Sequence, residues 1–246
     1  MIEKPEVVTI SSSTGKNPVK VRHTDRLWPH FLWHFTVDTN KALLMNENIE
    51  DRLYQLEEDG TGETSSNDGG FHSGNLRGEE CLKPLLGEYL PIGLKTIFND
   101  LGLDKHCSGD FNVGVWGNIN YPNCQNKPHL HPGSHLSGVY YIKHPADSGN
   151  LRLYNPHSYH ELEPFMNSHL EIHPSPGEFY IWRSDLMHDV GVNLSEEDRI
   201  SIAFNLYLHP KKSYWLRGVA SNHQFHPANN RLRLPISPPR NFLWRS

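Results

Sequence analysis

Two histidines separated by a single residue, His129 and His131, lie in the sequence Pro-His-Leu-His-Pro at positions 128–132. Side chains alternate along an extended strand, so both imidazoles are expected to project from the same face. Imidazole nitrogens are common ligands for divalent transition metals, and two such ligands need a third from elsewhere in the fold. The pair therefore predicts a metal site that a later part of the chain completes.

A third histidine, His188, follows a strand-like run at 178–183 after a short turn. Eleven residues later, Arg199 begins the run Arg-Ile-Ser-Ile-Ala-Phe-Asn at 199–205. Alternation places Arg199 and Ser201 on one face of that strand. A guanidinium can bind a carboxylate with two parallel hydrogen bonds, and a nearby hydroxyl can add a third. The pattern predicts a carboxylate clamp beside the metal ligands.

These residues resemble the motifs of the Fe(II)/2-oxoglutarate-dependent oxygenases, a superfamily built on a double-stranded β-helix, which is a jelly-roll, cupin-like fold. The chain is most similar to a group of 2OG-Fe(II) oxygenases of marine microbes and phages that carries a His-x-His-Pro motif. The resemblance extends from about residue 60 to 208. It depends on Pro-His-x-His-Pro at 128–132, Ser-Gly-Val-Tyr-Tyr at 137–141, Pro-x-x-Gly at 174–177 and Arg-Ile-Ser-x-x-Phe-Asn at 199–205.

The resemblance implies a non-haem iron oxygenase that uses O2 and 2-oxoglutarate to hydroxylate a substrate, with release of succinate and CO2. It implies that Fe(II) binds to His129, His131 and His188. The implied 2-oxoglutarate site consists of Arg199, Ser201, Tyr141 and Asn118. The metal and the cosubstrate would carry the chemistry, with no further catalytic side chain.

His131 departs from the superfamily pattern, in which an Asp or Glu usually stands two residues after the first histidine. Three arrangements are open. All three histidines bind the metal; or His129 and His188 bind it alone, with His131 behind them; or His131 binds in a shifted register completed by His135 or Asp189. A face of three neutral histidines would bind Fe(II) more weakly than one that includes a carboxylate.

Two other functions compete with the oxygenase hypothesis. A three-histidine, cupin-type dioxygenase would bind its organic substrate directly on iron, and it would not need the carboxylate clamp at Arg199 and Ser201. A jelly-roll binding module without catalysis would not bring the three histidines together. The substrate is expected to be a small molecule or a peptide, and the sequence leaves its identity and the oligomeric state open.

The composition restricts the partners. The 246-residue chain has a formal net charge of −5 at pH 7, and this argues against a general nucleic-acid-binding protein, which is usually basic. No apolar run reaches the length of about 18 residues that spans a membrane, and the N-terminus lacks a hydrophobic signal core. The three cysteines have unrelated spacings, which indicates free thiols in a reducing compartment. We therefore expect a cytoplasmic protein.

The elements that position these residues are expected in the order helices, then β-structure. Apolar periodicity predicts a helix from about residue 40 to 58 and another over 83–99 that Pro91 kinks. Strands are predicted at 111–119, 137–143, 151–154, 169–172, 178–183 and 199–208, and a short one at 7–10. We expect one domain over 1–246, with an N-terminal arm and packing helices (1–110), the double-stranded β-helix (111–208) and a C-terminal extension (209–246).

Overall fold

The computed structural model describes residues 30–63, 66–156, 168–211, 224–225 and 232–233. By spatial proximity the chain divides into two units, Met1–His30 and Phe31–Ser246, and everything below concerns the second. The short strand expected at 7–10 and most of the expected C-terminal extension lie outside the described residues. The division of the chain into one domain with three parts stays a prediction.

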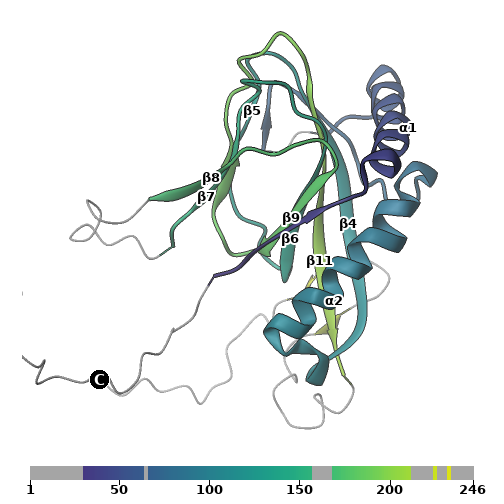
Figure 1. Cartoon of the computed structure of the whole chain (residues 1–246), viewed down its shortest axis with the longest axis vertical. Helices are drawn as coiled ribbons and strands as arrows, with labels where there is room; N and C mark the ends of the chain where they lie inside the picture. Colours follow the sequence, from purple (N-terminus) through teal and green to yellow (C-terminus); the bar gives the residue numbers. More distant parts are fainter. Residues whose placement is uncertain (1–29, 64–65, 157–167, 212–223, 226–231, 234–246) are drawn as a thin grey trace, which may run out of the picture. The chain divides into compact units, whose positions relative to one another are not determined.

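Two antiparallel sheets face each other across the interior of this unit (Figure 1). The six-stranded sheet consists, in spatial order, of β1 (Leu32–Thr36), β9 (Glu178–Arg183), β6 (Leu136–Lys143), β11 (Arg199–Pro210), β4 (Cys107–Asn120) and β3 (Phe71–His72). The five-stranded sheet consists of β2 (Asn67–Asp68), β5 (Gln125–His129), β10 (His188–Val190), β7 (Leu151–Tyr154) and β8 (His169–Ile172). A separate two-stranded pair joins β12 (Gln224–Phe225) and β13 (Leu232–Arg233).

Alternation along the strands of the larger sheet divides its side chains between two cores. On β11, Ile200 and Ile202 belong to the outer core under the helices, whereas Ser201 faces the space between the sheets. On β6, Tyr140 joins the outer core and Tyr141 the inner one. This is the period-two pattern expected of a sheet covered on both faces. Ser201, which the sequence places on the same face as Arg199, lines the cavity between the sheets.

Two helices cover the outer face of the six-stranded sheet: α1 (Thr39–Glu58) and α2 (Leu90–Leu101) (Figure 1). The carboxylate of Asp38 caps α1 by accepting hydrogen bonds from the backbone N–H groups of Asn40 and Lys41. Helix α1 packs closely on β4, because a Cβ at Gly117 would collide with the side chain of Leu53. Leu53 is fully buried, and a side chain of this kind stabilises the fold by about 1.5–3 kcal/mol.

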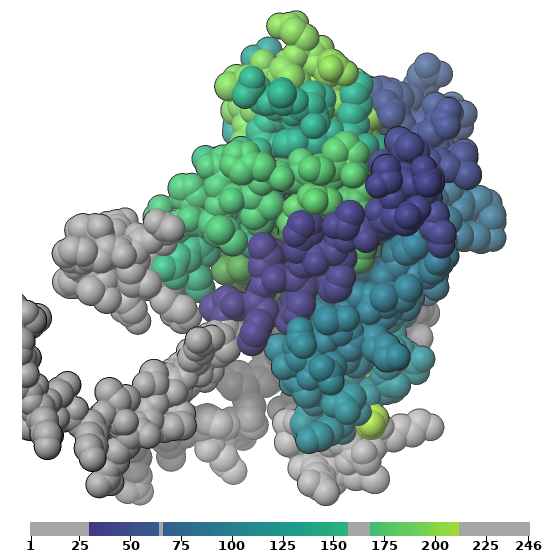
Figure 2. Space-filling view, in the orientation of Figure 1, coloured from purple at the N-terminus to yellow at the C-terminus, as the bar shows by residue number. Residues whose placement is uncertain are grey.

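The edge of the six-stranded sheet is formed by β1, which pairs antiparallel with β9 from Leu32↔Trp182 to Thr36↔Glu178. Figure 2 shows β1 in purple along the green β9. The extended, aromatic segment around Trp33 thus becomes a strand of the sheet, and Trp33 itself is buried in the outer core. Among the helices of the described part of the chain, none is long and apolar enough to cross a membrane.

The second predicted helix differs in its interior from the expectation. A 3₁₀ turn (Glu80–Leu82) and a π-helical turn (Leu85–Tyr89) precede α2, and Pro91 lies in the first turn of α2. The π-helical turn runs directly into α2, and the Leu90 N–H donates to the Leu85 carbonyl oxygen. A change of helix type therefore immediately precedes Pro91, which has no N–H to donate. A 3₁₀ turn at Leu103–Lys105 then leads into β4.

Candidate metal centre

The three histidines converge between the two sheets, on the side of the smaller one. His129 is the last residue of β5 and His188 the first of β10, and the two are direct partners across this antiparallel pair. His131 follows two residues after β5. One potential ligand nitrogen from each ring lies within 4.8 Å of the others. Nitrogen ligands lie about 2.0–2.1 Å from a divalent metal, so small ring rotations bring all three onto one ion.

Backbone carbonyl oxygens hold two of the three rings in one orientation. His129 Nδ1 lies 2.6 Å from the carbonyl oxygen of Lys127, and His188 Nδ1 lies 2.9 Å from that of Leu186. A carbonyl can only accept, so in both residues Nδ1 carries the proton and Nε2 keeps a free lone pair. A metal-binding histidine commonly donates its other N–H in this way. His129 and His188 therefore have the tautomer that ligation requires.

The environment of the three rings keeps them neutral. Burial, with smaller contributions from the neighbouring His188 and His129, lowers the pKa of His131 to about 3. Burial and the nearby His129 lower the pKa of His188 to about 4, and burial also lowers the pKa of His129. Metal binding requires deprotonated imidazole, which is the form that this cluster favours at neutral pH.

No carboxylate belongs to this cluster within the described residues. Asp189, next to His188, accepts hydrogen bonds from Arg152 at 2.7 and 2.8 Å and from the Tyr154 hydroxyl at 2.7 Å. His135 Nδ1 accepts a hydrogen bond from the backbone N–H of Leu208. Both alternatives for completing a shifted register are thus engaged elsewhere, and neither is in the metal-binding group.

A narrow cavity of about 40 Å³ extends from the histidines between the sheets. Asn118 of β4 and Ser201 of β11, both predicted from the sequence to line the site, are on its wall and are direct strand partners. Residues that sequence reasoning did not identify also line it: Ser66, Trp116, Asn126, Gly138, Val139, Leu151, Trp182, Val190 and Ala203.

Arg199 lies behind this cavity and is almost entirely buried, with 1% of its surface exposed. Its Nη1 donates to the carbonyl oxygens of Ser148, Gly149 and Gly191, and its Nη2 lies 3.5 Å from Oδ1 of the cavity residue Asn126. Burial lowers the pKa of Arg199, but guanidinium remains charged in proteins. Uncharged oxygens, and not a carboxylate of the described chain, thus surround this cation.

Two buried polar atoms of cavity-lining residues, Trp182 Nε1 and Asn118 Oδ1, have no hydrogen-bond partner among the described residues. The same holds for the Tyr141 hydroxyl, which is close enough to Arg199 to feel its charge. Burial raises the pKa of Tyr141 to about 12, so its hydroxyl keeps its proton and can donate. Native proteins seldom leave such groups unpaired, because each costs about 1–3 kcal/mol. An unused donor and an unused acceptor in the cavity wall, with a further unused donor near Arg199, indicate a polar ligand.

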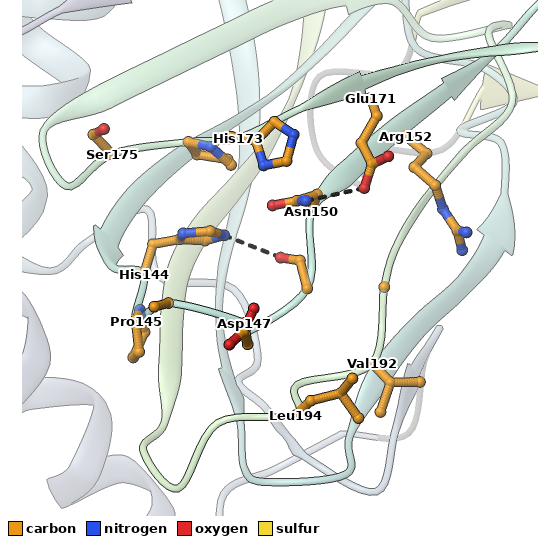
Figure 3. A pocket seen from close by; sticks show the side chains of 14 residues that line it. His144, Pro145, Asp147, Asn150, Arg152, Glu171, His173, Ser175, Val192 and Leu194 are labelled. Carbon is orange, nitrogen blue, oxygen red and sulfur yellow. Dashed lines mark hydrogen bonds between the residues drawn. The ribbon is translucent and has the colours of Figure 1, made fainter.

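A larger cavity of about 490 Å³ lies beyond Arg199, on the side away from the histidine cluster. Gly149 and Gly191, whose carbonyl oxygens accept from Arg199, form part of its wall. Figure 3 shows the rings of His144 and His173 on facing sides of it, with the His144 Nε2 hydrogen bond to Gly149 O. None of the three histidines of the metal-binding group lines this cavity. Although it is the larger of the two cavities, it is therefore not the candidate reaction site.

Comparisons with known proteins agree with this geometry. Residues 114–205 match a family model described as "Putative 2OG-Fe(II) oxygenase". No curated protein matches the sequence. The matched segment runs from β4 into β11 and contains the three histidines, Arg199 and Ser201.

Three solved structures illustrate the fold that this chain shares. A Pseudomonas putida prolyl-4-hydroxylase is 14% identical, with a TM-score of 0.54 over 72% of this chain and 92% of that one. The epimerase SnoN, in complex with Fe3+, alpha ketoglutarate and nogalamycin RO, is 11% identical, with a TM-score of 0.56 over 85% and 92%. HygX from Streptomyces hygroscopicus, with nickel, 2-oxoglutarate and hygromycin B, is 11% identical, with a TM-score of 0.51 over 72% and 82%.

At these identities the structural likeness establishes the fold, which is the double-stranded β-helix predicted from the sequence. The family match adds the enzyme class. Residues 114–205 are similar to the 2OG-Fe(II) oxygenases, a family whose metal and cosubstrate are iron and 2-oxoglutarate. The predicted resemblance to these oxygenases, the fold, the enzyme class and the cofactors are therefore confirmed.

Proposed function

We propose that this chain is an Fe(II)/2-oxoglutarate-dependent hydroxylase in which His129, His131 and His188 hold the iron. The observation that carries the proposal is the relation between this cluster and a buried arginine. The histidines line one cavity, and Arg199 lies behind the same cavity without a carboxylate partner among the described residues. A dicarboxylate that chelates a metal at one end and needs a cation at the other matches this arrangement.

The chain's own residues fit 2-oxoglutarate at its distal end. A buried charge costs free energy unless an opposite charge or hydrogen bonds offset the loss of water. The distal carboxylate would provide that charge to Arg199, and the unpartnered hydroxyl of Tyr141 would donate to it. Ser201 and Asn118 would contact the cosubstrate from the adjacent cavity wall. At about 40 Å³ the cavity is small, so binding requires wall side chains to move outward.

When bound, iron and 2-oxoglutarate supply oxidising chemistry in which O2 is consumed and the cosubstrate is converted to succinate and CO2. The protein's contribution is to orient the iron and the cosubstrate and to exclude water from the site. Neutral imidazoles leave the charge of Fe(II) uncompensated, so the chelating carboxylate of 2-oxoglutarate would offset part of that charge while the distal carboxylate pairs with Arg199. We expect metal affinity without 2-oxoglutarate to be modest and to rise when the cosubstrate is present.

The substrate class is proposed as a small molecule or a peptide. HygX and SnoN are described with hygromycin B and nogalamycin RO, and another relative in fold is a prolyl-4-hydroxylase. Trp116 offers an aromatic surface in the cavity wall, where its ring centroid lies 5.7 Å from that of His131 and 5.8 Å from that of His72. Because SnoN is an epimerase, C–H cleavage without hydroxylation is the alternative outcome.

A binding comparison between two 2-oxo acids tests the proposal. Pyruvate has the metal-chelating end of 2-oxoglutarate but lacks the distal carboxylate. In calorimetric titrations of the Mn(II)-loaded chain, 2-oxoglutarate should bind at least about tenfold more tightly than pyruvate, as expected when a charge-assisted hydrogen bond is added. This preference should shrink in Arg199→Met. Equal affinities in the wild type would contradict the clamp, and binding of neither acid would favour the cupin-type dioxygenase.

A further inference from the structure

Asn205 ends the Arg-Ile-Ser-x-x-Phe-Asn motif, and the proposed function assigns it no role. It lies on the inner face of β11, six residues after Arg199, where its side-chain amide contacts the third histidine of the cluster. Asn205 Nδ2 lies 3.4 Å from His131 Nδ1. On its other side, Asn205 Oδ1 accepts a hydrogen bond of 2.7 Å from the Ser137 hydroxyl. The Ser137 hydroxyl also lies 2.8 Å from that of Ser184.

His131 differs from the other two histidines in what faces its Nδ1. A backbone carbonyl, which can only accept, fixes the proton of His129 and His188 on Nδ1. His131 faces a side-chain amide, which can present either a donor or an acceptor. With the amide nitrogen toward the ring, Nδ1 must accept, the proton moves to Nε2, and Nε2 cannot bind a metal. With the amide oxygen toward the ring, Nδ1 keeps the proton and Nε2 is free to bind.

The partners of Asn205 permit both orientations. If the amide turns by half a rotation, His131 Nδ1–H donates to Asn205 Oδ1, Asn205 Nδ2–H donates to the Ser137 hydroxyl, and Ser137 donates to Ser184. Ser137 and Ser184 are buried, with 1% and 2% of their surface exposed, so water does not replace these bonds. A hydroxyl both donates and accepts, and the chain of hydrogen bonds therefore stays complete in either direction.

We infer that Asn205 is a positioning residue that selects the tautomer of His131 and so decides whether His131 is the third metal ligand. The inference rests on the proposed function, because it requires that the cluster bind a metal. In the metal-bound state the amide oxygen faces His131, and the arrangement is that of a ligating histidine held by an oxygen acceptor. In the metal-free state the amide orientation is free to change.

The backbone around His131 strengthens this assignment. The His131 N–H donates to the carbonyl oxygen of Ser184 at 3.1 Å, and the Ser134 hydroxyl donates to the His131 carbonyl at 2.8 Å. Ser184 thus supports His131 twice, once through the backbone and once through Ser137 and Asn205. These contacts hold the backbone of His131 in place, which leaves the proton of its ring as the variable that Asn205 controls.

Titration with Co(II) alone tests the inference with a readout that does not depend on turnover. The affinity is measured from the growth of the Co(II) d–d absorption in the wild type, Asn205→Leu and Asn205→Asp. Loss of an outer hydrogen-bond partner typically weakens metal binding by about 10–100-fold. We expect that loss in Asn205→Leu. Asn205→Asp, whose carboxylate can only accept, should bind Co(II) at least as tightly as the wild type.

The same variants in a His131→Ala background separate this role from a general structural effect. If Asn205 acts through His131, Asn205→Leu should cause no further loss there, and its d–d spectrum should match that of His131→Ala. An affinity within twofold of the wild type in Asn205→Leu, or an equal loss in both backgrounds, would overturn the inference. Should Asn205→Leu fail to fold, weaker binding in Asn205→Asp would overturn it instead.

Failure of the proposed function gives a different pattern. In that case the wild type itself would not bind Co(II), or His188→Ala would bind it as well as the wild type does. Binding in the wild type that His188→Ala abolishes and Asn205→Leu leaves unchanged would retain the metal centre and overturn only the role of Asn205. The three results are distinct, so one set of titrations decides both questions.

Discussion

His129 and His188 face each other across the antiparallel pair β5–β10, with ring centroids 4.3 Å apart. Each ring is held through Nδ1 by the carbonyl oxygen of the residue two positions earlier. The pairing joins residues that are far apart in the sequence, and it gives both residues the same tautomer. These two residues are therefore the fixed part of the metal centre, to which His131 is added.

His129 and His188 should each be indispensable for metal binding. His129→Ala and His188→Ala should each lower the Fe(II) affinity at least about 100-fold, because each removes one of three neutral ligands and leaves only one backbone-held imidazole beside His131. His169→Ala is a suitable control, since His169 lies on β8 and outside the metal-binding group. Anaerobic equilibrium dialysis measures bound iron in all three variants. An equal loss in the His169 variant would mean that histidine removal acts through the fold.

Two adjacent tyrosines should respond in opposite ways to loss of their hydroxyls. The Tyr141 hydroxyl is buried without a partner among the described residues, whereas the Tyr140 hydroxyl donates to Asn46 Oδ1 at 2.5 Å. Tyr141→Phe should leave the melting temperature of the ligand-free chain unchanged or raise it, yet weaken 2-oxoglutarate binding by roughly 5–10-fold. Tyr140→Phe should lower stability by about 1–3 kcal/mol and leave that binding unchanged.

Thermal melts and calorimetric titrations with 2-oxoglutarate in the presence of Mn(II) measure both effects. The two variants remove the same atom from neighbouring residues of one strand, so each is a control for the other. If Tyr141→Phe destabilised the ligand-free chain and left 2-oxoglutarate binding intact, Tyr141 would be a core residue only.

Gly149 maintains the position of the buried arginine. Its φ is +86°, and a Cβ there would meet Gly191 O and lie 2.7 Å from Arg199 Nη1. Gly149→Ala should therefore displace the guanidinium and raise the 2-oxoglutarate concentration needed for half-saturation. Gly109→Ala controls for backbone strain, since Gly109 has φ +91° and nothing within 4 Å of the added carbon. It should cost only about 1–2 kcal/mol of stability and leave binding unchanged.

The metal-free chain should lose stability as the pH falls from about 6.5 to about 4. The pKa of His131 is about 3 and that of His188 about 4 in the folded state, below the ordinary histidine value of 6.5. In this range the unfolded chain takes up protons that the folded chain does not, so the free energy of unfolding decreases. Each of these two histidines contributes up to about 1.4 kcal/mol per pH unit.

Urea denaturation in chelator at pH 7, 6 and 5 measures this dependence. Other buried groups also titrate, so the contribution of the cluster is isolated by comparing the wild type with His131→Gln. The variant should have the shallower slope. A slope that is the same in both, or steeper in the variant, would contradict a neutral, buried His131.

Much of the fold follows from local patterns in the sequence. The predicted strands at 151–154, 169–172 and 178–183 coincide with β7, β8 and β9. The division of β11 into a cavity face with Ser201 and a helix-covered face with Ile200 follows from alternation alone. These features depend on side-chain periodicity and on turn residues. Both are local signals that span a few residues, so they can be recognised in a single sequence.

The rest depends on relations between strands. Asn126 and His129 are three residues apart on β5, so alternation predicts opposite faces, yet both line the cavity. The register between β5 and β10 shifts, since His129 pairs with His188 and Asn126 with Val190. Such an irregularity places an extra residue on one strand and changes which face the next residue occupies. The contact between the Asn205 amide and His131 Nδ1 is likewise a tertiary contact that no local pattern encodes.

The central claim is that three histidines and a buried arginine form one site for Fe(II) and 2-oxoglutarate. Its most direct test is the visible absorption of the chain mixed anaerobically with Fe(II) and 2-oxoglutarate, where chelation of Fe(II) by the 2-oxo acid produces a metal-to-ligand charge-transfer band. We predict this band in the wild type and its loss in His188→Ala. In Arg199→Lys the band should form only at higher 2-oxoglutarate concentrations than in the wild type. Correctly folded wild-type protein that gives no band, or a His188→Ala variant that keeps it, would contradict the account.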